Sequence, residues 1–280
     1  MAAVHDKGSS YPPTDLHLAQ RLEGAEAAAS IAFVEAHAAL NRDVGATHMR
    51  IGVVAAIFDG PESPLTQTFG LGVFGAPGTA EFESIENSFL SRSAPVQHEV
   101  SGLAATDTVV QLSARGYRTV EFSTVLVRPA SIPLDGVRGV AVRRIRPEEG
   151  PLWCRTAAEG GGSESAELAD FIEAFGAVMV RAADVQCFLA EIAGRPVATG
   201  ALCLAGDVAL LAAASTIPSA RRQGAQLALL GARLDYALAQ RAGLAMMVAQ
   251  PDSASMRNAE FQGFRTAYTR TKWWLAGGAA

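Results

Sequence analysis

One short segment occurs twice in this chain, and its recurrence limits the folds that the chain can adopt. Gly116-Tyr117-Arg118-Thr119 and Gly263-Phe264-Arg265-Thr266 place a glycine, an aromatic residue, an arginine and a threonine in the same order. Each copy follows a short predicted helix, and its glycine stands where that helix ends. We therefore expect a diverged internal repeat. A simpler explanation stays open at this point, because glycines that end helices before an aromatic residue also occur without any repeat.

The predicted elements fall into two series. In the first we expect helices over residues 16–40, 79–91 and 107–115, and strands over 50–58, 68–74, 96–100 and 117–128. In the second we expect helices over 151–159, 165–181, 224–241 and 253–262, a flexible glycine loop over 160–163, and strands over 137–145, 185–192, 197–204, 208–216, 244–250 and 264–274. The 280 residues correspond to two domains at about 150 residues each. We expect a flexible tail over 1–14, an N-terminal domain over 15–134 and a C-terminal domain over 135–280.

Composition excludes several functional classes. Hydrophobic residues make up 49% of the chain, which favours a packed core over disorder. The net charge of −5 argues against nucleic-acid and membrane-surface partners, which require a cationic surface. We see no signal peptide in residues 1–13 and no apolar run of the ~18 residues that a spanning helix needs. The cysteines Cys154, Cys187 and Cys203 show no Cys-x-x-Cys spacing and the histidines are scattered, so we expect a reduced, cytoplasmic protein without a metal.

The segment from Thr216 to Leu227 is the sharpest candidate for binding chemistry. It joins a predicted strand to a predicted helix, and Gly224 at the junction permits close approach of a ligand to the backbone. Free N–H groups in the first helical turn favour an anion, and Arg221 and Arg222 add donors suited to phosphate oxygens. The alternative is a helix start with two solvated arginines. The segment is neither a Walker loop nor a dinucleotide fingerprint.

At these residues the chain resembles the GNAT superfamily of acyl-CoA-dependent N-acyltransferases. The pyrophosphate loop of that family reads Arg/Gln-x-x-Gly-x-Gly/Ala, and Arg221-Arg222-Gln223-Gly224-Ala225-Gln226 matches it except at Gln226. The order of predicted elements over residues 137–274 also resembles one GNAT domain. The resemblance implies an α/β (α+β) protein of two GNAT-like lobes, each a mixed, mostly antiparallel sheet flanked by helices.

The resemblance assigns binding roles to particular residues. The main chain of Ala214, Ser215 and Thr216 would pair with the pantetheine arm of acetyl-CoA as an added strand does. Asn258 lies where the family often contacts that arm. The remaining cofactor-binding candidates, whose N–H groups or side chains would hold the pyrophosphate, are Arg221, Arg222, Gln223, Gly224, Ala225, Gln226 and Leu227.

Catalytic residues are harder to assign. Many family members have a tyrosine four residues before the glycine of the Gly-Phe pair, and here that position is Ala259. Glu191 is a candidate base that takes a proton from the amine, although a solvated glutamate at a sheet edge is the competing interpretation. Tyr268 is a candidate acid, and packing of an aromatic side chain in the core competes with that role.

The first series has a glycine loop at the equivalent place, over residues 74–80. It lacks both arginines, and Glu81 and Glu83 occupy the first turn of the helix that follows. Carboxylates there satisfy the helix start and repel a pyrophosphate. We therefore interpret the first half as a degenerate GNAT lobe that contributes at most a wall of the acceptor pocket. His98 and Glu99 are conceivable contributors, with surface positions on a strand as the alternative.

These observations predict an N-acetyltransferase that moves an acetyl group from acetyl-CoA to a primary amine. A non-catalytic acyl-CoA-binding regulatory module and a purely structural protein stay open as alternatives. Residues 208–234 contain Arg221, Arg222 and Arg233 and no Asp or Glu, which predicts a small cationic cradle. The acceptor, the acyl-chain length and the choice between monomer and homodimer are not determined by the sequence.

Overall fold

The computed structural model describes residues 11–276, so most of the predicted tail, residues 1–10, lies outside the described residues. The helices are α1 (Leu16–Leu40), α2 (Thr79–Leu90), α3 (Thr106–Ala114), α4 (Gly150–Gly161), α5 (Ala166–Met179), α6 (Ala225–Ala239) and α7 (Ala254–Phe261). The strands are β1 (Thr47–Ile51), β2 (Val54–Phe58), β3 (Gln67–Phe69), β4 (Val96–Ser101), β5 (Arg118–Pro129), β6 (Val140–Arg144), β7 (Val185–Ile192), β8 (Arg195–Ala205), β9 (Val208–Thr216), β10 (Leu244–Ala249) and β11 (Arg265–Leu275).

The chain divides into two compact units that do not simply follow one another in the sequence. The central unit is Arg128–Met247, named for its place in the sequence. The terminal unit combines Pro12–Val127 with the described residues after Met247. This division differs from the predicted domains 15–134 and 135–280, because the C-terminal stretch that carries α7 and β11 groups with the first half. The reason is that β11 pairs with β4 and β5.

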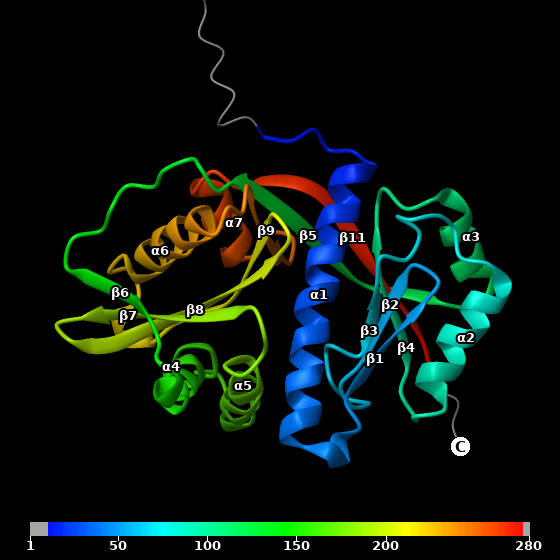
Figure 1. The fold of residues 1–280 in the computed structure, drawn as a ribbon, viewed down its shortest axis with the longest axis horizontal. Coiled ribbons are helices and arrows are strands. Elements are labelled where there is room, and N and C mark those ends of the chain that lie inside the picture. The colour runs from blue at the N-terminus through cyan, green and yellow to red at the C-terminus, as the bar shows by residue number, and fades with distance from the viewer. Residues whose placement is uncertain (1–10, 277–280) are drawn as a thin grey trace, which may run out of the picture. The chain divides into compact units, whose positions relative to one another are not determined.

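In the terminal unit the strands lie in the order β1-β2-β3-β4-β11-β5. Only β3 and β4 are parallel, and the remaining neighbours are antiparallel. Figure 1 shows β11, the last strand of the chain, between β4 and β5. Its register runs from Leu275 opposite Val96 to Arg265 opposite Val127. The C-terminal strand therefore completes the sheet that the first half of the chain begins.

In the central unit the strands lie in the order β10-β9-β8-β7-β6. The pairs β6–β7, β7–β8 and β8–β9 are antiparallel, and β9–β10 is parallel. Figure 1 shows α6 on one side of this sheet and α4 with α5 on the other. Both units thus have the predicted architecture of a mixed, mostly antiparallel sheet flanked by helices.

The two copies of the repeated segment have the same geometry. Gly116 and Gly263 both adopt positive φ, at 84° and 82°. The next residue donates its N–H to a carbonyl five residues back in each case, Tyr117 to Leu112 at 3.1 Å and Phe264 to Ala259 at 3.0 Å. Each aromatic side chain is buried. The element order α1-β1-β2-β3-α2-β4-α3-β5 also recurs as α5-β7-β8-β9-α6-β10-α7-β11. A helix C-cap alone does not account for this match, and the predicted repeat is confirmed.

The repeat also relates β5 to β11. Arg270 lies opposite Ser123 in the antiparallel register, and its Nε donates to the Ser123 Oγ at 3.3 Å across a separation of 147 residues. That separation is the offset between the two glycines, so Ser123 and Arg270 are equivalent positions of the repeat. Antiparallel pairing of equivalent positions is what a local two-fold relationship between the two strands produces.

Several predicted boundaries are correct and several are wrong. The helix predicted over 16–40 has the same bounds as α1. Its N-terminus is capped by the Asp15 side chain, which accepts the Leu18 N–H at 2.8 Å. The strand expected over 50–58 is a hairpin, because Gly52 adopts φ 58° and turns the chain between β1 and β2. The predicted strand 68–74 ends at Phe69.

The prediction of a flexible glycine loop over 160–163 is also wrong at its start, because α4 continues to Gly161. A Cβ at Gly160 would lie 2.9 Å from the Thr216 N, so a glycine is needed where α4 approaches β9.

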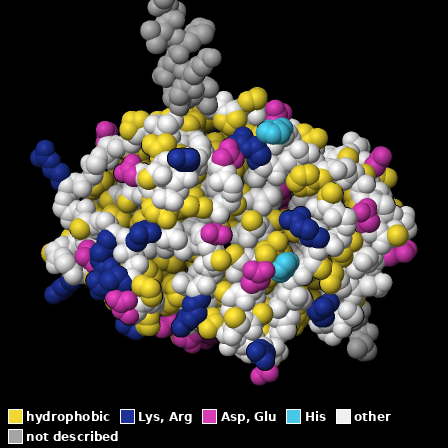
Figure 2. Space-filling model, viewed as in Figure 1, with side chains coloured by type: hydrophobic (Ala, Val, Ile, Leu, Met, Phe, Trp, Pro, Cys, Tyr) yellow, Lys and Arg dark blue, Asp and Glu magenta, His cyan; other side chains and the backbone are white. Residues whose placement is uncertain are grey.

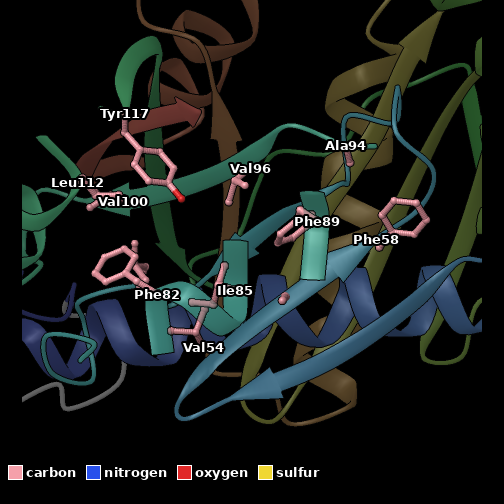
Figure 3. Close-up of a cluster of buried hydrophobic side chains, with 12 residues drawn as sticks. Val54, Phe58, Phe82, Ile85, Phe89, Ala94, Val96, Val100, Leu112 and Tyr117 are labelled. Carbon is pink, nitrogen blue, oxygen red and sulfur yellow. The ribbon is translucent and has the colours of Figure 1, made fainter. Parts of the chain in front are cut away.

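The terminal unit contains a core in which α2 and α3 pack against β2 and β4 (Figure 3). Phe82, Ile85 and Phe89 of α2 are fully buried in it. His98 of β4, expected at the surface, is also fully buried, and its Nδ1 lies 2.7 Å from the Thr68 Oγ1. Burial lowers the pKa of His98 to about 3, so the ring is neutral in the folded protein. This histidine is a core residue.

The central unit contains the three cysteines, all of them buried free thiols. Cys154 and Cys187 pack with Trp153, whose Nε1 donates to the Phe188 carbonyl at 3.0 Å. The three cysteines are therefore core residues.

Candidate functional site

The site begins at the end of β9. The register of β9 with β10 ends at the pair Leu210–Met246, whereas β9 itself continues to Thr216. The register with β8 shifts between Ala212 and Ser215, and Ala213 adopts φ 49° there. This is a β-bulge, which bends a strand and re-aims its backbone groups. Ala213 and Ala214 are exposed, so the end of β9 offers backbone to a ligand.

The loop after β9 leads into the N-terminus of α6. A short 3-10 turn, Pro218–Ala220, follows the strand, and α6 begins at Ala225. Gly224 is the N-cap residue with φ 83°, and no side chain caps the helix. The first turn of α6 contains no acidic residue. The N–H groups and the positive end of the helix dipole are thus open to an anion.

Gly224 is required for two reasons. Its φ is strained for any residue with a Cβ. A Cβ there would also lie 2.6 Å from the Cγ1 of Val137, on the segment before β6.

The two arginines of the loop have different environments. Arg221 donates from its guanidinium to the Thr216 carbonyl at 3.4 Å, the Gly160 carbonyl at 3.2 Å and the Ser163 Oγ at 3.3 Å. It ties the end of β9 to the end of α4. Arg222 is exposed, and its guanidinium has no hydrogen-bond or ion-pair partner within residues 11–276. It also adopts φ 65°, a strained conformation for arginine that is often found at functional sites.

Both glutamines of the predicted motif also make contacts. Gln226 donates from Nε2 to the Ser215 carbonyl and to the Thr216 Oγ1, each at 2.7 Å. Gln223 donates to the Ser219 carbonyl at 3.1 Å and stays within the loop. The structure therefore brings Arg221, Gln226, Ser215 and Thr216 together, and Gly224 and Ala225 form the adjacent helix start.

Arg233 is not part of a surface cradle, which corrects the prediction. It is buried, and its guanidinium donates to the carbonyls of Leu229, Ala201 and Ala212. Burial lowers the pKa of Arg233 to about 10. Arg233 contacts the Ala212 carbonyl beside the bulge in β9, and the exposed cations of the segment are Arg221 and Arg222.

The equivalent helix start in the terminal unit is closed. The Glu81 carboxylate of α2 accepts the N–H of the N-cap residue Gly78 at 2.8 Å. The same carboxylate lies over the β1–β2 turn, where a Cβ on Gly52 would meet its Oε1. A carboxylate already holds the position that an anion would take, as the sequence predicts.

The predicted catalytic residues both have structural partners. Glu191 on β7 pairs with Arg143 of β6 at 2.9 Å. Tyr268 is buried in the terminal unit, and its hydroxyl donates to the Glu23 Oε1 at 3.0 Å. Burial and the Glu23 carboxylate raise the pKa of Tyr268, which makes it a weaker acid. Their catalytic roles stay predictions, and the contacts with Arg143 and Glu23 give each residue a structural role as well.

Tyr268 belongs to a buried ionic cluster that sequence reasoning missed. Arg270 on β11 contacts Glu26 of α1 at 2.6 Å and Glu99 of β4 at 3.3 Å. It also lies 3.5 Å from Glu23, whose second carboxylate oxygen is buried and has no hydrogen-bond partner among the residues that the structure describes. Burial raises the pKa of Glu23 to about 7, against the opposing effect of Arg270. The alternation Tyr268-Arg270-Lys272 on one face of a strand is the only trace of this cluster in the sequence.

Asn258 lies on α7, in the terminal unit, and its side chain is exposed. Its assignment to the cofactor arm stays a prediction. Ala259 is buried, and its carbonyl accepts the Phe264 N–H at the C-terminal end of α7.

On the face shown in Figure 2, Lys and Arg side chains are interspersed with Asp and Glu. Within the described part of the chain, no helix combines the length and the apolar composition needed to cross a membrane.

Comparison with protein-family models and with curated proteins finds no match. Solved structures do match. A GCN5-related N-acetyltransferase from Kribbella flavida aligns over 89% of this chain and 96% of its own, with a TM-score of 0.61 and 20% identity. A second GCN5-related N-acetyltransferase, from Sphaerobacter thermophilus, aligns over 96% and 94% with a TM-score of 0.55 and 13% identity. A tandem GNAT protein from the clavulanic acid biosynthesis pathway aligns over 81% and 79% with a TM-score of 0.56 and 13% identity. These alignments span both halves of the sequence, and this chain has the GNAT fold in its tandem, two-lobed form.

Proposed function

We propose that this protein is an acyl-CoA-dependent N-acetyltransferase that moves an acetyl group from acetyl-CoA to a primary amine, and that the central unit binds the donor. The observation that carries the proposal is the start of α6, where Gly224 leaves the helix uncapped and Arg222 is exposed beside it. The structural neighbours, named as N-acetyltransferases, support the same reaction class.

The residues at this site suit the parts of the donor. The N–H groups of Gly224, Ala225, Gln226 and Leu227 would donate to the pyrophosphate oxygens, with Arg222 as a charge-assisted donor. The backbone of Ala214 to Thr216 would pair with the amides of the pantetheine arm. The bulge at Ala213 lies just before this backbone, and Arg233 contacts the Ala212 carbonyl beside it.

Acetyl-CoA supplies an activated thioester, so the protein has to orient the arm and assist loss of one proton from the amine. An alkyl amine has a pKa of about 10 and is mostly protonated at neutral pH. Glu191 is the carboxylate proposed to accept that proton, which requires it to leave Arg143. The thiolate leaving group has a modest pKa, and this reduces the need for an acid at Ala259.

The test is a calorimetric titration with acetyl-CoA, followed by a thiol-release screen over aminoglycosides, amino acids, polyamines and peptides. We expect binding by the wild type and about 10-fold weaker binding by Arg222→Ala, the loss of one charge-assisted contact. Lys272→Ala, a cation removed from the terminal unit, is the control. Absence of binding heat at millimolar acetyl-CoA with folded protein would falsify the proposal.

The second candidate is an acyl-CoA-binding module without turnover. Ala259 in place of the usual tyrosine and the engagement of Glu191 by Arg143 favour it. Binding of acetyl-CoA without thiol release across the whole amine panel would select this candidate.

A further inference from the structure

Gln226 holds the end of β9 with its side-chain amide. The Nε2 group donates to the Ser215 carbonyl and to the Thr216 hydroxyl, both at 2.7 Å. These are short, well-formed hydrogen bonds between the first turn of α6 and the last two residues of the strand. Gln226 is half-buried, so its side chain has solvent on one side into which it can rotate.

One partner of Gln226, the Ser215 carbonyl, belongs to the backbone that the proposed function assigns to the pantetheine arm. That arm presents secondary amides, whose N–H groups donate to strand carbonyls in the manner of an added strand. The Gln226 amide offers the same donor chemistry to the same carbonyl. A carbonyl oxygen has two lone pairs, and Ser215 is already paired with Thr199 of β8. The Gln226 amide at 2.7 Å therefore occupies the acceptor site that an N–H of the arm would need.

A residue with a long amide side chain is itself the departure from the GNAT loop motif at this position. Glycine or alanine there has no donor and leaves the end of the strand open. Arg221 and Gln223 have other partners than the Ser215 carbonyl, because Arg221 donates to Thr216 and to α4, and Gln223 donates to Ser219.

We propose that Gln226 is a placeholder for the pantetheine arm: its amide occupies the end of β9 when no arm is paired there, and it rotates away when acyl-CoA binds. This inference rests on the proposed function. It gives the protein a built-in competitor that weakens binding of the arm and leaves binding of the pyrophosphate unchanged. Gln226 is therefore a positioning residue that sets affinity.

The experiment compares acetyl-CoA with ADP, which carries a pyrophosphate and no arm, by calorimetry on the wild type and on Gln226→Ala. We expect Gln226→Ala to bind acetyl-CoA about 5-fold tighter for each hydrogen bond that no longer competes. ADP affinity should stay equal in the two proteins. Gln240→Ala removes an exposed amide at the opposite end of α6 and should change neither affinity.

Gln226→Met separates hydrogen bonding from bulk, since methionine has similar length and no donor. Tighter acetyl-CoA binding by both variants supports competition by the hydrogen bonds. Tighter binding by Gln226→Ala alone assigns the effect to bulk and overturns the role of the amide. A measurement independent of affinity is the Gln226 side-chain NH₂ signal in ¹⁵N NMR, which should move and lose protection from solvent exchange when acetyl-CoA binds and not when ADP binds. Thermal melts verify that each variant is folded.

Equal or weaker acetyl-CoA binding by Gln226→Ala, with a wild type that binds, overturns the placeholder and leaves the proposed function standing. Failure of the wild type and of both Gln226 variants to bind acetyl-CoA overturns the proposed function and the placeholder with it. Binding by Gln226→Ala alone supports both and shows strong competition.

Discussion

The two repeats differ in how their equivalent helices, α2 and α6, begin. In α2 a carboxylate of the first turn, Glu81, accepts the N–H of the N-cap residue Gly78. In α6 the N-cap Gly224 has no side-chain partner, and Arg222, two residues before it, is exposed. One fold thus produces a sealed helix start and an open one, and a single side chain three residues after the N-cap makes the difference.

The same contrast holds for buried arginines. Arg270 of the terminal unit is surrounded by the carboxylates of Glu23, Glu26 and Glu99. Arg233 of the central unit donates to backbone carbonyls. These three acidic residues of the first repeat face inward, and Glu23 and Glu26 hold α1 on the sheet. The second repeat has kept acidic residues away from its helix start, which a site for phosphate requires.

The largest expected effect concerns the inward-facing carboxylates. The pKa of Glu23 is about 7 in the folded protein, above its ordinary value, and the groups that face it are Arg270, Glu26, Glu99 and Tyr268. The folded state therefore binds this proton more tightly than the unfolded state. The Glu23 contribution to stability is present below pH ~4.5 and is lost as the pH rises to about 7, by about 2–3 kcal/mol.

Urea unfolding from pH 4.5 to 8 measures this effect as the difference between the wild type and Glu23→Gln, which cannot ionise. The subtraction is needed because neutral His98 acts in the other direction: its pKa of about 3 makes stability fall as the pH drops below 6.5. Parallel profiles for the two proteins would contradict the prediction.

The second prediction closes the open helix start by copying the sealed one. Leu227 occupies the position in α6 that Glu81 occupies in α2, three residues after the N-cap glycine. We expect Leu227→Glu to weaken acetyl-CoA binding about 30-fold, because a carboxylate takes up the N–H groups and repels the pyrophosphate. Calorimetry measures the affinity, and Leu227→Gln is the uncharged control. Equal loss in both variants would assign the effect to packing of Leu227 instead of charge.

The third prediction compares the two N-cap glycines. Gly224 has φ 83° and a Cβ there would lie 2.6 Å from Val137, whereas Gly78 has φ −75° and an open environment. Gly224→Ala should cost about 1–3 kcal/mol of unfolding free energy, and Gly78→Ala about 0.5 kcal/mol or less. Chemical denaturation of both variants measures the difference. Similar costs would mean that the α6 start is not strained.

The smallest expected effect comes from opening the sealed start. Glu81→Ala removes the capping contact with Gly78 and should cost about 0.5–1 kcal/mol. It should not create acetyl-CoA affinity, because residues 74–80 contain no arginine. Denaturation and calorimetry on the same sample test both statements, and new binding would show that a free helix start is sufficient.

The sequence predicted features that depend on local patterns. The limits of α1, β7 and β9 follow from apolar spacing and agree with the structure. The sealed start of α2 follows from the charge of Glu81 in the first turn. The open start of α6 follows in the same way from Gly224 and the absence of acidic neighbours.

Features that depend on distant partners could not be predicted. The insertion of β11 between β4 and β5 is a choice among strand edges, which no local pattern encodes. The burial of Arg233 and Arg270 contradicts the usual exposure of charged residues and depends on carbonyls and carboxylates supplied by other elements. The contact of Gln226 with Ser215 likewise requires the geometry of the loop between them.

The place of β11 has a consequence for the order in which the protein can fold during synthesis. Residues 265–275 leave the ribosome after every other described strand, and until then β4 and β5 lack the neighbour that lies between them. The first repeat therefore cannot finish its sheet as an independent domain while the second is being translated. A ribosome that stalls in the second repeat leaves an incomplete first repeat, with two open strand edges exposed to aggregation. Although only one repeat keeps an open helix start, neither can be produced in finished form without the other.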